Sequence, residues 1–519
     1  MCGIAGYVGD RESADVLVDA LSKLEYRGYD SAGIAVFDHG NIKVKKCKGR
    51  LANLVEKMDE EGKPQGHVGI GHTRWATHGE PSDINSHPHG NKRVTIVHNG
   101  IIENYKKLKD FLVGEGYSFA SETDTEVAAK LLDYYYDGDP MKTIAKVLSE
   151  IKGSYALGIM FRDFPDEIFA VRKDSPLIVG VGEHENFIAS DVPAIIHYTR
   201  DYYLLDQNEI AVIKKDSVKI YDVHGNEIHK ELNTADWDVD AAEKGGYAHF
   251  MLKEIHEQPD SVKRTIMPRI MDDMPDFSAE GFNPDKLKNY KNIYIVACGT
   301  AMHAGMVGKY IIEKMARVSV TVDIASEFRY RDPFIDDKTL FIAISQSGET
   351  LDTLAALREA KAKGARVLSV VNVVGSSVAR ESDDVFYTWA GPEIAVASTK
   401  AYTTQLVCMY MLGLYMGRKK GIISDEVYKN YIDELLAVPD KLTSLLKQEK
   451  KIEALAKKLY KRNNVFFIGR GNDAAVAYEG SLKLKEISYI NSFAIAAGEL
   501  KHGTIALIEQ DTLVIALAT

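Results

Sequence analysis

Cysteine is scarce in this chain of 519 residues, and the four that occur (Cys2, Cys47, Cys298 and Cys408) form no C-x-x-C pair. Their spacing provides neither a disulfide framework nor a thiolate zinc site. A long apolar run is also missing, since the most apolar stretch, residues 406–416, has about half the length of a membrane-spanning helix. The start, MCGIAGYVGD, lacks the basic segment and apolar core of a secretory signal. We therefore expect a cytoplasmic protein without a membrane partner.

Excess positive charge is absent as well. Lys and Arg number 64 against 75 Asp and Glu, which gives a formal net charge of −11. A nucleic-acid surface needs clustered basic side chains, so we expect no nucleic-acid partner. A chain of this length exceeds a single hydrophobic core, and its length predicts two or three domains.

The first part of the chain, about 230 residues, predicts many short strands with amphipathic helices between them, an α+β or layered α/β pattern. We expect strands at residues 3–8, 33–37, 69–73, 94–97, 156–161, 168–171 and 210–213, and helices at residues 13–23, 103–115, 125–136 and 141–151. The polar residues 234–246 end in a Gly-Gly pair, which indicates a linker. A helical hinge is expected at about residues 248–274.

The second half alternates strands and helices at the spacing typical of a doubly wound parallel sheet. We expect strands at residues 293–297, 318–324, 339–344 and 367–373, and helices at residues 302–315, 351–363, 398–415 and 425–460.

An internal repeat lies within this half. Residues 292–295, 325–329 and 339–343 (NIYI, ASEFR and TLFIA) parallel residues 464–467, 497–501 and 512–516 (NVFF, AGELK and TLVIA). Three segments in register favour a duplication of one fold. The second copy stops at Thr519, where the first continues into Ser345. A parallel strand without a following crossover is an unusual end for a domain, so we expect the second copy to be incomplete and the natural C-terminus to be missing.

Cys2 becomes the first residue once Met1 is removed, and methionine removal is efficient before a small residue. An α-amino group has a pKa of about 7.7–8.0, against about 8.5 for a thiol, so the amine can act as general base for its own thiol. Position alone favours an ordinary small residue over a nucleophile. Four motifs then follow in order: YRGYDS from Tyr26, GHTRWATHG from Gly71, HNG from His98 and SETDT from Ser121.

Together with Cys2, these motifs resemble the class II glutamine amidotransferase domain over roughly residues 2–230. The resemblance implies an N-terminal-nucleophile αββα glutaminase fold in which Cys2 attacks the side-chain amide of glutamine. It implies that Arg74 holds the α-carboxylate and Asp124 the α-ammonium, roles that suit a guanidinium fork and a carboxylate. Asn99 and the Gly100 N–H are implied to form the oxyanion hole. Thr77 and His78 are implied to line the same glutamine pocket.

Each of these residues also has an ordinary interpretation when taken alone. Arg74 is compatible with a surface ion pair, Asn99-Gly100 with a turn, and Asp124 with a helix cap. Five elements in the right order favour the glutaminase. Six histidines are dense enough to raise the question of a metal: His67, His72, His78, His87, His89 and His98. They form no H-E-x-x-H motif, so we expect no metal and no cofactor, and we expect these histidines to order loops around the glutamine pocket.

A second candidate site lies in residues 345–350 (SQSGET), between a buried-type strand and a helix. Hydroxyls and backbone N–H groups at a helix N-terminus form a cradle for phosphate, although the same residues are equally suited to cap the helix. The segment has no Lys and no G-K-[ST], so a phosphate monoester is favoured over a nucleoside triphosphate. Residues 298–300 follow the first strand and should share the carboxyl edge of the sheet, with another edge loop at residues 390–400.

Glu479, Lys483 and Glu486 are spaced four and three apart, which places them on one helical face. A solvated charged face is the usual meaning of such spacing. With residues 498–503 (GELKHG), these motifs resemble the duplicated sugar-isomerase (SIS) domains of the glucosamine-6-phosphate synthase family. The resemblance runs from Cys2 almost to Thr519. It implies two tandem doubly wound α/β SIS subdomains, the second incomplete, after the glutaminase domain.

The family resemblance implies L-glutamine and fructose 6-phosphate as substrates, glucosamine 6-phosphate and L-glutamate as products, and a homodimer through the isomerase domains. Glu486 is implied to move a proton between C1 and C2, Lys483 to assist it, and His502 to open the sugar ring from a second subunit. Trp75 is implied to gate an ammonia channel between the halves. Sugar-phosphate binding is implied for Thr300, Ser345, Gln346, Ser347, Thr350, Val396 and Ser398.

Three departures from the family pattern are expected to matter: Ala301 in place of a common Ser, Thr504 in place of Pro, and the absence of a tail with an active-site Lys. An amidotransferase for another sugar phosphate and a non-catalytic sugar-phosphate sensor remain alternatives. The expected domains are the glutaminase at residues 1–233, a linker and helical hinge at 234–284, the first SIS subdomain at 285–423, connecting helices at 424–454 and the second, incomplete SIS subdomain at 455–519.

Overall fold

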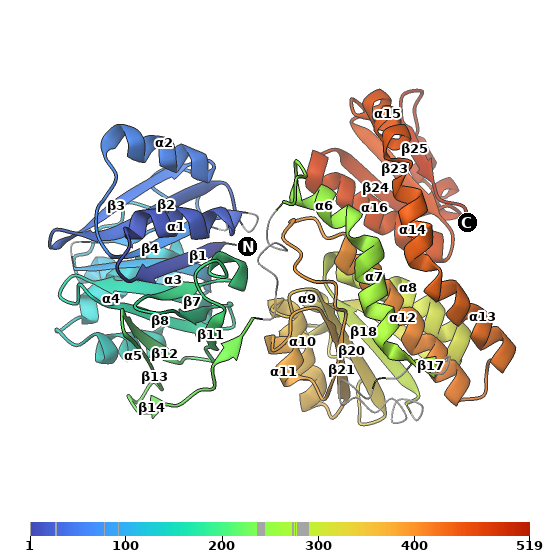
Figure 1. Ribbon diagram of the computed structural model, residues 1–519, viewed down its shortest axis with the longest axis horizontal. Coiled ribbons are helices and arrows are strands. Elements are labelled where there is room, and N and C mark those ends of the chain that lie inside the picture. Colours follow the sequence, from blue (N-terminus) through green and yellow to red (C-terminus); the bar gives the residue numbers. More distant parts are fainter. Residues whose placement is uncertain are drawn as a thin grey trace. The chain divides into compact units, whose positions relative to one another are not determined.

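The computed structural model describes residues 2–25, 28–76, 78–91, 93–235, 244–271, 274–275, 277 and 290–519. The chain divides into two compact units, Met1–Ala242 and Glu243–Thr519 (Figure 1). Each unit is described by itself.

The first unit contains two antiparallel sheets with helices on their outer faces. The order of the first sheet is β15-β11-β9-β10-β1-β4-β2-β3, and that of the second is β14-β13-β12-β8-β7-β6-β5. Apolar side chains from both sheets, among them Ile4, Ile70, Val97 and Ile188, form one buried cluster, so the two sheets pack face to face. Helices α1 and α2 contact the first sheet, and α4 contacts the second. The result is the predicted αββα order of layers.

The bounds of these elements agree with most of the expected strands and helices. The first sheet consists of β1 (Gly3–Val8), β2 (Ser31–Asp38), β3 (Asn41–Lys48), β4 (Val68–Arg74), β9 (Ile178–Val181), β10 (Asn186–Ala189), β11 (Asp201–Leu204) and β15 (Asn233–Thr234). The second consists of β5 (His89–Gly90), β6 (Val94–Ile102), β7 (Gly153–Phe161), β8 (Ile168–Lys173), β12 (Ile210–Lys214), β13 (Ser217–Tyr221) and β14 (Glu227–Ile228). The helices are α1 (Ser13–Ser22), α2 (Leu51–Glu61), α3 (Tyr105–Gly114), α4 (Asp124–Tyr135) and α5 (Pro140–Glu150).

The second unit contains two parallel sheets. The five-stranded sheet has the order β19-β18-β20-β21-β22, so the strand order reverses between β18 and β20. Ligands of doubly wound sheets bind at such a switch point, at the carboxyl ends of the strands. The other sheet has three parallel strands in the order β24-β23-β25.

The elements of the second unit follow in chain order. They are α6 (Phe250–His256), α7 (Gln258–Ile266), β16 (Ile270–Met271), β17 (Met274–Pro275), β18 (Asn292–Ala297), α8 (Gly299–Ala316), β19 (Ser319–Ile324), α9 (Ala325–Phe328), β20 (Thr339–Ser345), α10 (Leu351–Ala362), β21 (Arg366–Val371), α11 (Ser377–Glu381), β22 (Asp384–Tyr387) and α12 (Lys400–Lys419). Then come α13 (Asp425–Leu436), α14 (Val438–Leu446), α15 (Glu449–Leu459), β23 (Asn464–Gly469), α16 (Asn472–Ser488), β24 (Asn491–Ala496), the short 3-10 helices η7 (Glu499–Lys501) and η8 (Thr504–Leu507), and β25 (Leu513–Ala516).

The internal repeat corresponds to matching arrangements of strands. In the first copy β18 lies between β19 and β20, and in the second β23 lies between β24 and β25 in the same order. Helix α8 follows β18 and helix α16 follows β23. The sequence duplication is therefore a duplication of the strand–helix unit that forms the switch point.

Two predicted helical stretches differ from the structure. The hinge expected at about residues 248–274 is wrong in its last part, because β16 and β17 pair there as a short hairpin. Pro259 lies in the first turn of α7, and Pro268 in the first turn of the 3-10 helix that follows it. A proline lacks the backbone N–H that a helix interior needs, so each of them marks the start of a new helix. The helix expected at residues 425–460 is three helices, with Pro439 in the first turn of α14.

Helices α8 and α12 cross at very short distance in the core of the second unit. A Cβ atom added at Gly417 would lie 2.4 Å from the carbonyl oxygen of Met315, and one at Gly413 would lie 2.8 Å from Ile311 Cγ2. Glycine on α12 therefore permits the contact between the helices. No helix of the described residues is long and apolar enough to cross a membrane.

We predict that Gly417→Ala lowers the free energy of unfolding of the second unit by about 1–3 kcal/mol, because the added methyl group must separate two packed backbones. Gly114→Ala is the control: it lies in helix α3 with no atom within 4 Å of an added Cβ. That change should stabilise the first unit by about 0.5–1 kcal/mol. Calorimetric unfolding transitions measure both effects, and a Gly417→Ala protein as stable as the parent would contradict the packing argument.

Candidate active sites

The Cys2 thiol lies at the start of β1, the strand between β4 and β10 in the first sheet. The pairing of Gly3 with Thr73 brings the end of β4 alongside it. The backbone N–H of Trp75 donates to Cys2 Sγ at 3.2 Å. Burial raises the pKa of the Cys2 thiol above its ordinary value, and the Trp75 N–H acts in the opposite direction. The thiol therefore needs a base to become a nucleophile at neutral pH.

Asn99 is oriented beside Cys2 by a buried histidine. His72 Nε2 lies 3.0 Å from Asn99 Oδ1 and 3.0 Å from the carbonyl oxygen of His98. Both of those atoms are acceptors, so Nε2 carries the proton and donates. Burial lowers the pKa of His72 to about 3, which keeps the imidazole neutral. The Asn99 amide can then point only one way: its Nδ2 donates to the Cys2 carbonyl oxygen at 3.0 Å and to Ser190 Oγ at 2.9 Å.

Gly100 is the next residue of β6, and its backbone requires glycine. Its φ of +129° lies in the region that L side chains avoid. A Cβ atom there would lie 2.1 Å from the carbonyl oxygen of Ser154 on the neighbouring strand β7. Beside Asn99, the strand therefore presents bare backbone with no side chain.

Arg74, the last residue of β4, is only 3% exposed, which excludes the surface ion pair that its sequence context left open. One guanidinium nitrogen, Nη2, donates to the carbonyl oxygens of His78 and of Gly79, the latter at 3.0 Å. The other, Nη1, is buried and has no partner among the residues that the structure describes. A buried donor left unpaired is costly. This nitrogen is therefore available for the carboxylate of a bound ligand.

Asp124 is buried at the start of α4, but it is not the cap of that helix. The cap is Thr123, whose side chain accepts from the Glu126 N–H at 3.2 Å. Asp124 Oδ2 accepts from the N–H of Ile102 at 2.8 Å, which fixes the carboxylate two residues beyond Gly100 along β6. The alternative of a helix cap is thus wrong.

The remaining predicted residues of the first site surround this group. The ring of His78 packs edge-on against Tyr105, and that of Trp75, 44% exposed, against Tyr29. Thr77 lies outside the described residues. The buried imidazoles of His72 and His87 stack at 4.1 Å, and burial lowers the pKa of both.

The second site begins at the carboxyl end of β20. Ser345 Oγ accepts from the N–H of Gly348 at 3.0 Å and lies 3.0 Å from Thr350 Oγ1. Gly348 has φ of +64°, and a Cβ there would lie 2.0 Å from Ser376 Oγ, so the turn requires glycine. Ser347 Oγ accepts from the Glu349 N–H at 3.2 Å.

This turn leads directly into α10, whose N-terminal cap position is occupied by Thr350. Within the described chain, the Thr350 side chain makes no capping hydrogen bond to the helix. The first N–H groups of α10 are therefore available to an anion, which favours the phosphate cradle over the capping alternative. The backbone N–H of Asn372 donates to the Gln346 carbonyl oxygen at 3.2 Å and supports the turn from β21.

The first turn of α8, after β18, meets α16 through a set of buried charges. Glu479 is 5% exposed, and it accepts from Thr300 Oγ1 at 2.9 Å and pairs with His303 Nδ1 at 2.7 Å. Lys483 Nζ donates to Thr300 Oγ1 at 2.9 Å and to Glu486 at 2.5 Å. The alternative of a solvated charged face is wrong for Glu479. Side chains that lie 176–183 positions apart in the sequence thus contact each other at one edge of the second site.

Three further predicted residues lie apart from this group. Val396 is 61% exposed. Ser398, expected as the first residue of a helix, lies in the loop before α12, where its Oγ donates to Glu393 at 2.7 Å. His502 lies in an exposed turn after η7. No hydrogen bond joins it to Glu486 or Lys483 in the part of the chain that the structure describes.

Some residues of both sites were not predicted from the sequence as parts of them. Ser190 contacts Asn99 only because β10 pairs with β1, and His303 contacts Glu479 only because α8 packs on α16. Neither lies in a motif. Across the described residues, no group of three or more His, Cys, Asp and Glu side chains is arranged to hold a metal ion.

Comparisons with known proteins match both halves. A SIS domain model matches residues 286–415 and 458–519, and a glutamine amidotransferase domain model matches residues 72–197. The solved C-terminal domain of glucosamine-fructose-6-phosphate aminotransferase from Francisella tularensis is similar over 53% of this chain and 78% of that chain, with 43% sequence identity and a TM-score of 0.51.

Curated relatives match the whole chain. The glutamine–fructose-6-phosphate aminotransferase (isomerizing) of Clostridium tetani is 60% identical over 523 residues, which cover 100% of this chain and 86% of that protein. The protein of the same name from Caldanaerobacter subterraneus subsp. tengcongensis is 59% identical with the same coverage. The chain therefore belongs to the glutamine–fructose-6-phosphate aminotransferase (isomerizing) family.

Proposed function

We propose that the protein transfers the amide nitrogen of L-glutamine to fructose 6-phosphate and forms glucosamine 6-phosphate and L-glutamate, a step of amino-sugar biosynthesis. The main structural support for the glutaminase half of this proposal is the orientation of the Asn99 amide. His72 holds its oxygen, and its donor nitrogen lies 3.0 Å from the Cys2 carbonyl oxygen. The names of the relatives that match the whole chain support the sugar acceptor.

Cys2 is the nucleophile of the first half-reaction. After removal of Met1, its own α-amine takes the thiol proton, and sulfur attacks the amide carbon of glutamine. The oxygen of that amide becomes negative and receives hydrogen bonds from the Gly100 N–H and from Asn99 Nδ2, which gives up its bond to the Cys2 carbonyl oxygen for this purpose. The protonated α-amine then gives its proton to the amide nitrogen, which leaves as ammonia when the intermediate collapses. Water hydrolyses the thioester to glutamate and the free thiol. Chemistry of this kind needs only the groups that surround Cys2.

Recognition of glutamine uses two opposite charges. The buried Arg74 binds the α-carboxylate through Nη1, and Asp124 accepts from the α-ammonium. Thr77 and His78 complete the pocket. Both charged groups are held by backbone contacts, Arg74 by the loop after β4 and Asp124 by β6, so the pocket is preformed.

The second half-reaction uses the carboxyl edge of the five-stranded sheet. Thr300, Ser345, Gln346, Ser347 and Thr350 bind the phosphate of the sugar, with help from the open N-terminus of α10. Val396 and Ser398 contact the sugar itself. Ammonia condenses with the C2 carbonyl with loss of water. Glu486, paired with Lys483 at 2.5 Å, then moves a proton from C1 to C2.

Three finer features belong to the same proposal. Trp75, whose backbone contacts the Cys2 sulfur and whose ring is partly exposed, gates the release of ammonia into a channel toward the sugar. His502 enters the isomerase site of a partner subunit, which accounts for its exposed turn and implies a homodimer. The protein acts in the cytoplasm.

We predict that Cys2→Ala reduces the release of glutamate from glutamine to the background rate, because no other group can form the thioester. Binding of fructose 6-phosphate, measured by calorimetry, should stay unchanged. Glutamate release by the parent protein is measured with and without fructose 6-phosphate, together with detection of the amino sugar. Absence of glutaminase activity in protein freed of Met1 would contradict the proposed function. Stimulation by another phosphosugar alone would show that the acceptor is wrong.

Asn99→Ala tests the oxyanion hole. Loss of one such donor costs about 2.7–4 kcal/mol of transition-state stabilisation, so the glutaminase kcat should fall by roughly 10²–10³ with little change in KM. Asn104→Ala is the matched control, because among the described residues its side chain bonds the backbone of Glu150 and Lys152 alone. A comparable loss in both variants would mean that Asn99 acts through the fold alone.

A further inference from the structure

The loop between β22 and α12, residues 388–399, carries Val396 and Ser398 but contains no regular helix or strand. A loop that contacts a substrate must be held in place by something other than backbone ladders. Two side chains from other parts of the second unit and one from the loop itself provide that support. They are Asn372, Glu254 and Glu393.

Asn372 holds the start of the loop. Its Nδ2 donates to the Gly391 carbonyl oxygen at 2.8 Å, and its Oδ1 accepts from the N–H of Ala390 at 2.8 Å. The backbone N–H of the same residue donates to Gln346. The start of the loop is thus joined through one residue to the turn at residues 345–350, where the sugar phosphate is proposed to bind.

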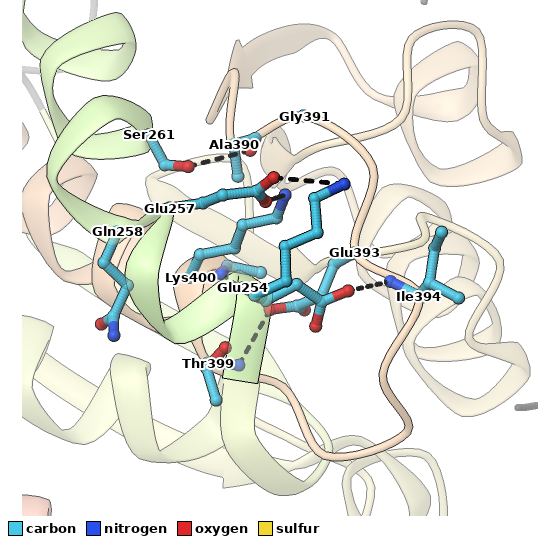
Figure 2. A network of polar contacts seen from close by, with 12 residues as sticks. Glu254, Glu257, Gln258, Ser261, Ala390, Gly391, Glu393, Ile394, Thr399 and Lys400 are labelled. Atoms are coloured by element: carbon cyan, nitrogen blue, oxygen red, sulfur yellow. Dashed lines mark hydrogen bonds and ion pairs between the residues drawn. The ribbon is translucent and has the colours of Figure 1, made fainter. Parts of the chain in front are cut away.

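Glu254, from helix α6, holds the middle of the loop (Figure 2). Its Oε1 accepts from the N–H of Ile394 at 2.5 Å and from that of Ala395 at 3.0 Å. Glu254 is 2% exposed. These two amides immediately precede Val396, so the position of Val396 follows that of the carboxylate.

Glu393 holds the end of the loop. It accepts from Ser398 Oγ at 2.7 Å, from the Thr399 N–H at 2.8 Å and from the Ala401 N–H at 3.1 Å. Its carboxylate lies near that of Glu254 (Figure 2). The carboxylates of Glu254 and Glu393 thus hold the parts of the loop that carry Val396 and Ser398.

The charges around Glu254 do not balance. The acidic neighbours are Glu257 and Glu393, and burial raises the pKa of the Glu393 carboxyl as well. The basic neighbours, Lys400 and Lys253, both pair with Glu257, at 2.6 and 3.5 Å. Glu254 itself has no paired ammonium among the ion pairs of the described residues. Burial first, and then the charge of Glu393, raise the pKa of Glu254 to about 7, while the loop amides and Lys400 act in the opposite direction.

We propose that Glu254 is a positioning residue for the sugar: its carboxylate docks the backbone at residues 394–395 and thereby sets Val396 and Ser398 against fructose 6-phosphate. The inference rests on the proposed sugar site at this edge of the sheet. It adds a residue of the hinge region to the isomerase half.

Ionisation of Glu254 should then affect sugar binding near neutral pH. A charged acceptor makes stronger hydrogen bonds to the loop amides than a neutral one. Above about pH 7 the carboxylate holds the loop, and below it the neutral acid holds it more weakly. The substitution Glu254→Gln keeps one acceptor oxygen and the same shape, so it mimics the protonated state at every pH.

The test is the dissociation constant for fructose 6-phosphate, measured by calorimetry at about pH 6 and pH 8 in the parent, Glu254→Gln and Glu257→Gln proteins. At pH 8 we expect binding to Glu254→Gln to be about five- to tenfold weaker than to the parent, and at pH 6 nearly equal. The phosphate of the sugar also titrates near pH 6, but this affects all three proteins alike and cancels in the ratio. Glu257→Gln, which removes the same charge without touching the loop backbone, should bind like the parent at both pH values.

Stability separates positioning from a purely structural role. Because the folded-state pKa of Glu254 is raised, ionised Glu254 destabilises the fold, and this cost grows as pH rises from the unfolded value toward about 7. Glu254→Gln removes the cost, so its unfolding midpoint at pH 8 should equal or exceed that of the parent while sugar binding is weaker. Hydrogen exchange of the amides of residues 394–395 should be faster in this variant.

If the ratio of the dissociation constants of the Glu254→Gln and parent proteins is the same at pH 6 and pH 8, the proposal is wrong. It is also wrong if Glu257→Gln weakens sugar binding at pH 8 as Glu254→Gln does. Failure of the parent to bind fructose 6-phosphate at either pH would refute the proposed sugar site itself, and the positioning role with it.

Discussion

The pairing of β1 with β4 on one side and β10 on the other is the constraint on which the first site depends. Because Cys2 precedes β1 directly, the register of this strand decides where the thiol lies. The same pairing brings Arg74, the last residue of β4, and Trp75 and Ser190, which directly follow β4 and β10. A shift by one residue would turn every side chain of β1 to the other face and remove the nucleophile from its donors.

Buried polar groups complete what the strand register begins. In the first unit, a neutral His72 fixes the orientation of the Asn99 amide. In the second, Glu479 and Glu254 are carboxylates removed from water, each satisfied by donors that come from a distant part of the chain. Such groups are costly unless every bond is made, so they hold one arrangement of loops and helix ends. Both proposed sites consist of loops held in this way at the ends of strands.

Much of the fold could be predicted from hydrophobic patterns, because buried strands such as β1 and β20 read as short apolar runs. The edge strand β3 was not predicted, since its sequence NIKVKKCK contains four lysines that suit an exposed edge. Motif residues such as Arg74 and Asp124 could be named, and the structure shows both buried. Ser190, His303 and Glu254 could not be assigned, because their partners lie far away in sequence and only strand pairing or helix packing brings them together.

The central claim is that nitrogen released at Cys2 reaches the sugar. Glutamine labelled with a heavy isotope in its amide nitrogen, supplied with fructose 6-phosphate and an excess of unlabelled ammonium, tests it most directly by mass spectrometry of the product. The account predicts glucosamine 6-phosphate that carries the label. Unlabelled glucosamine 6-phosphate, or labelled ammonia with no amino sugar, would contradict it.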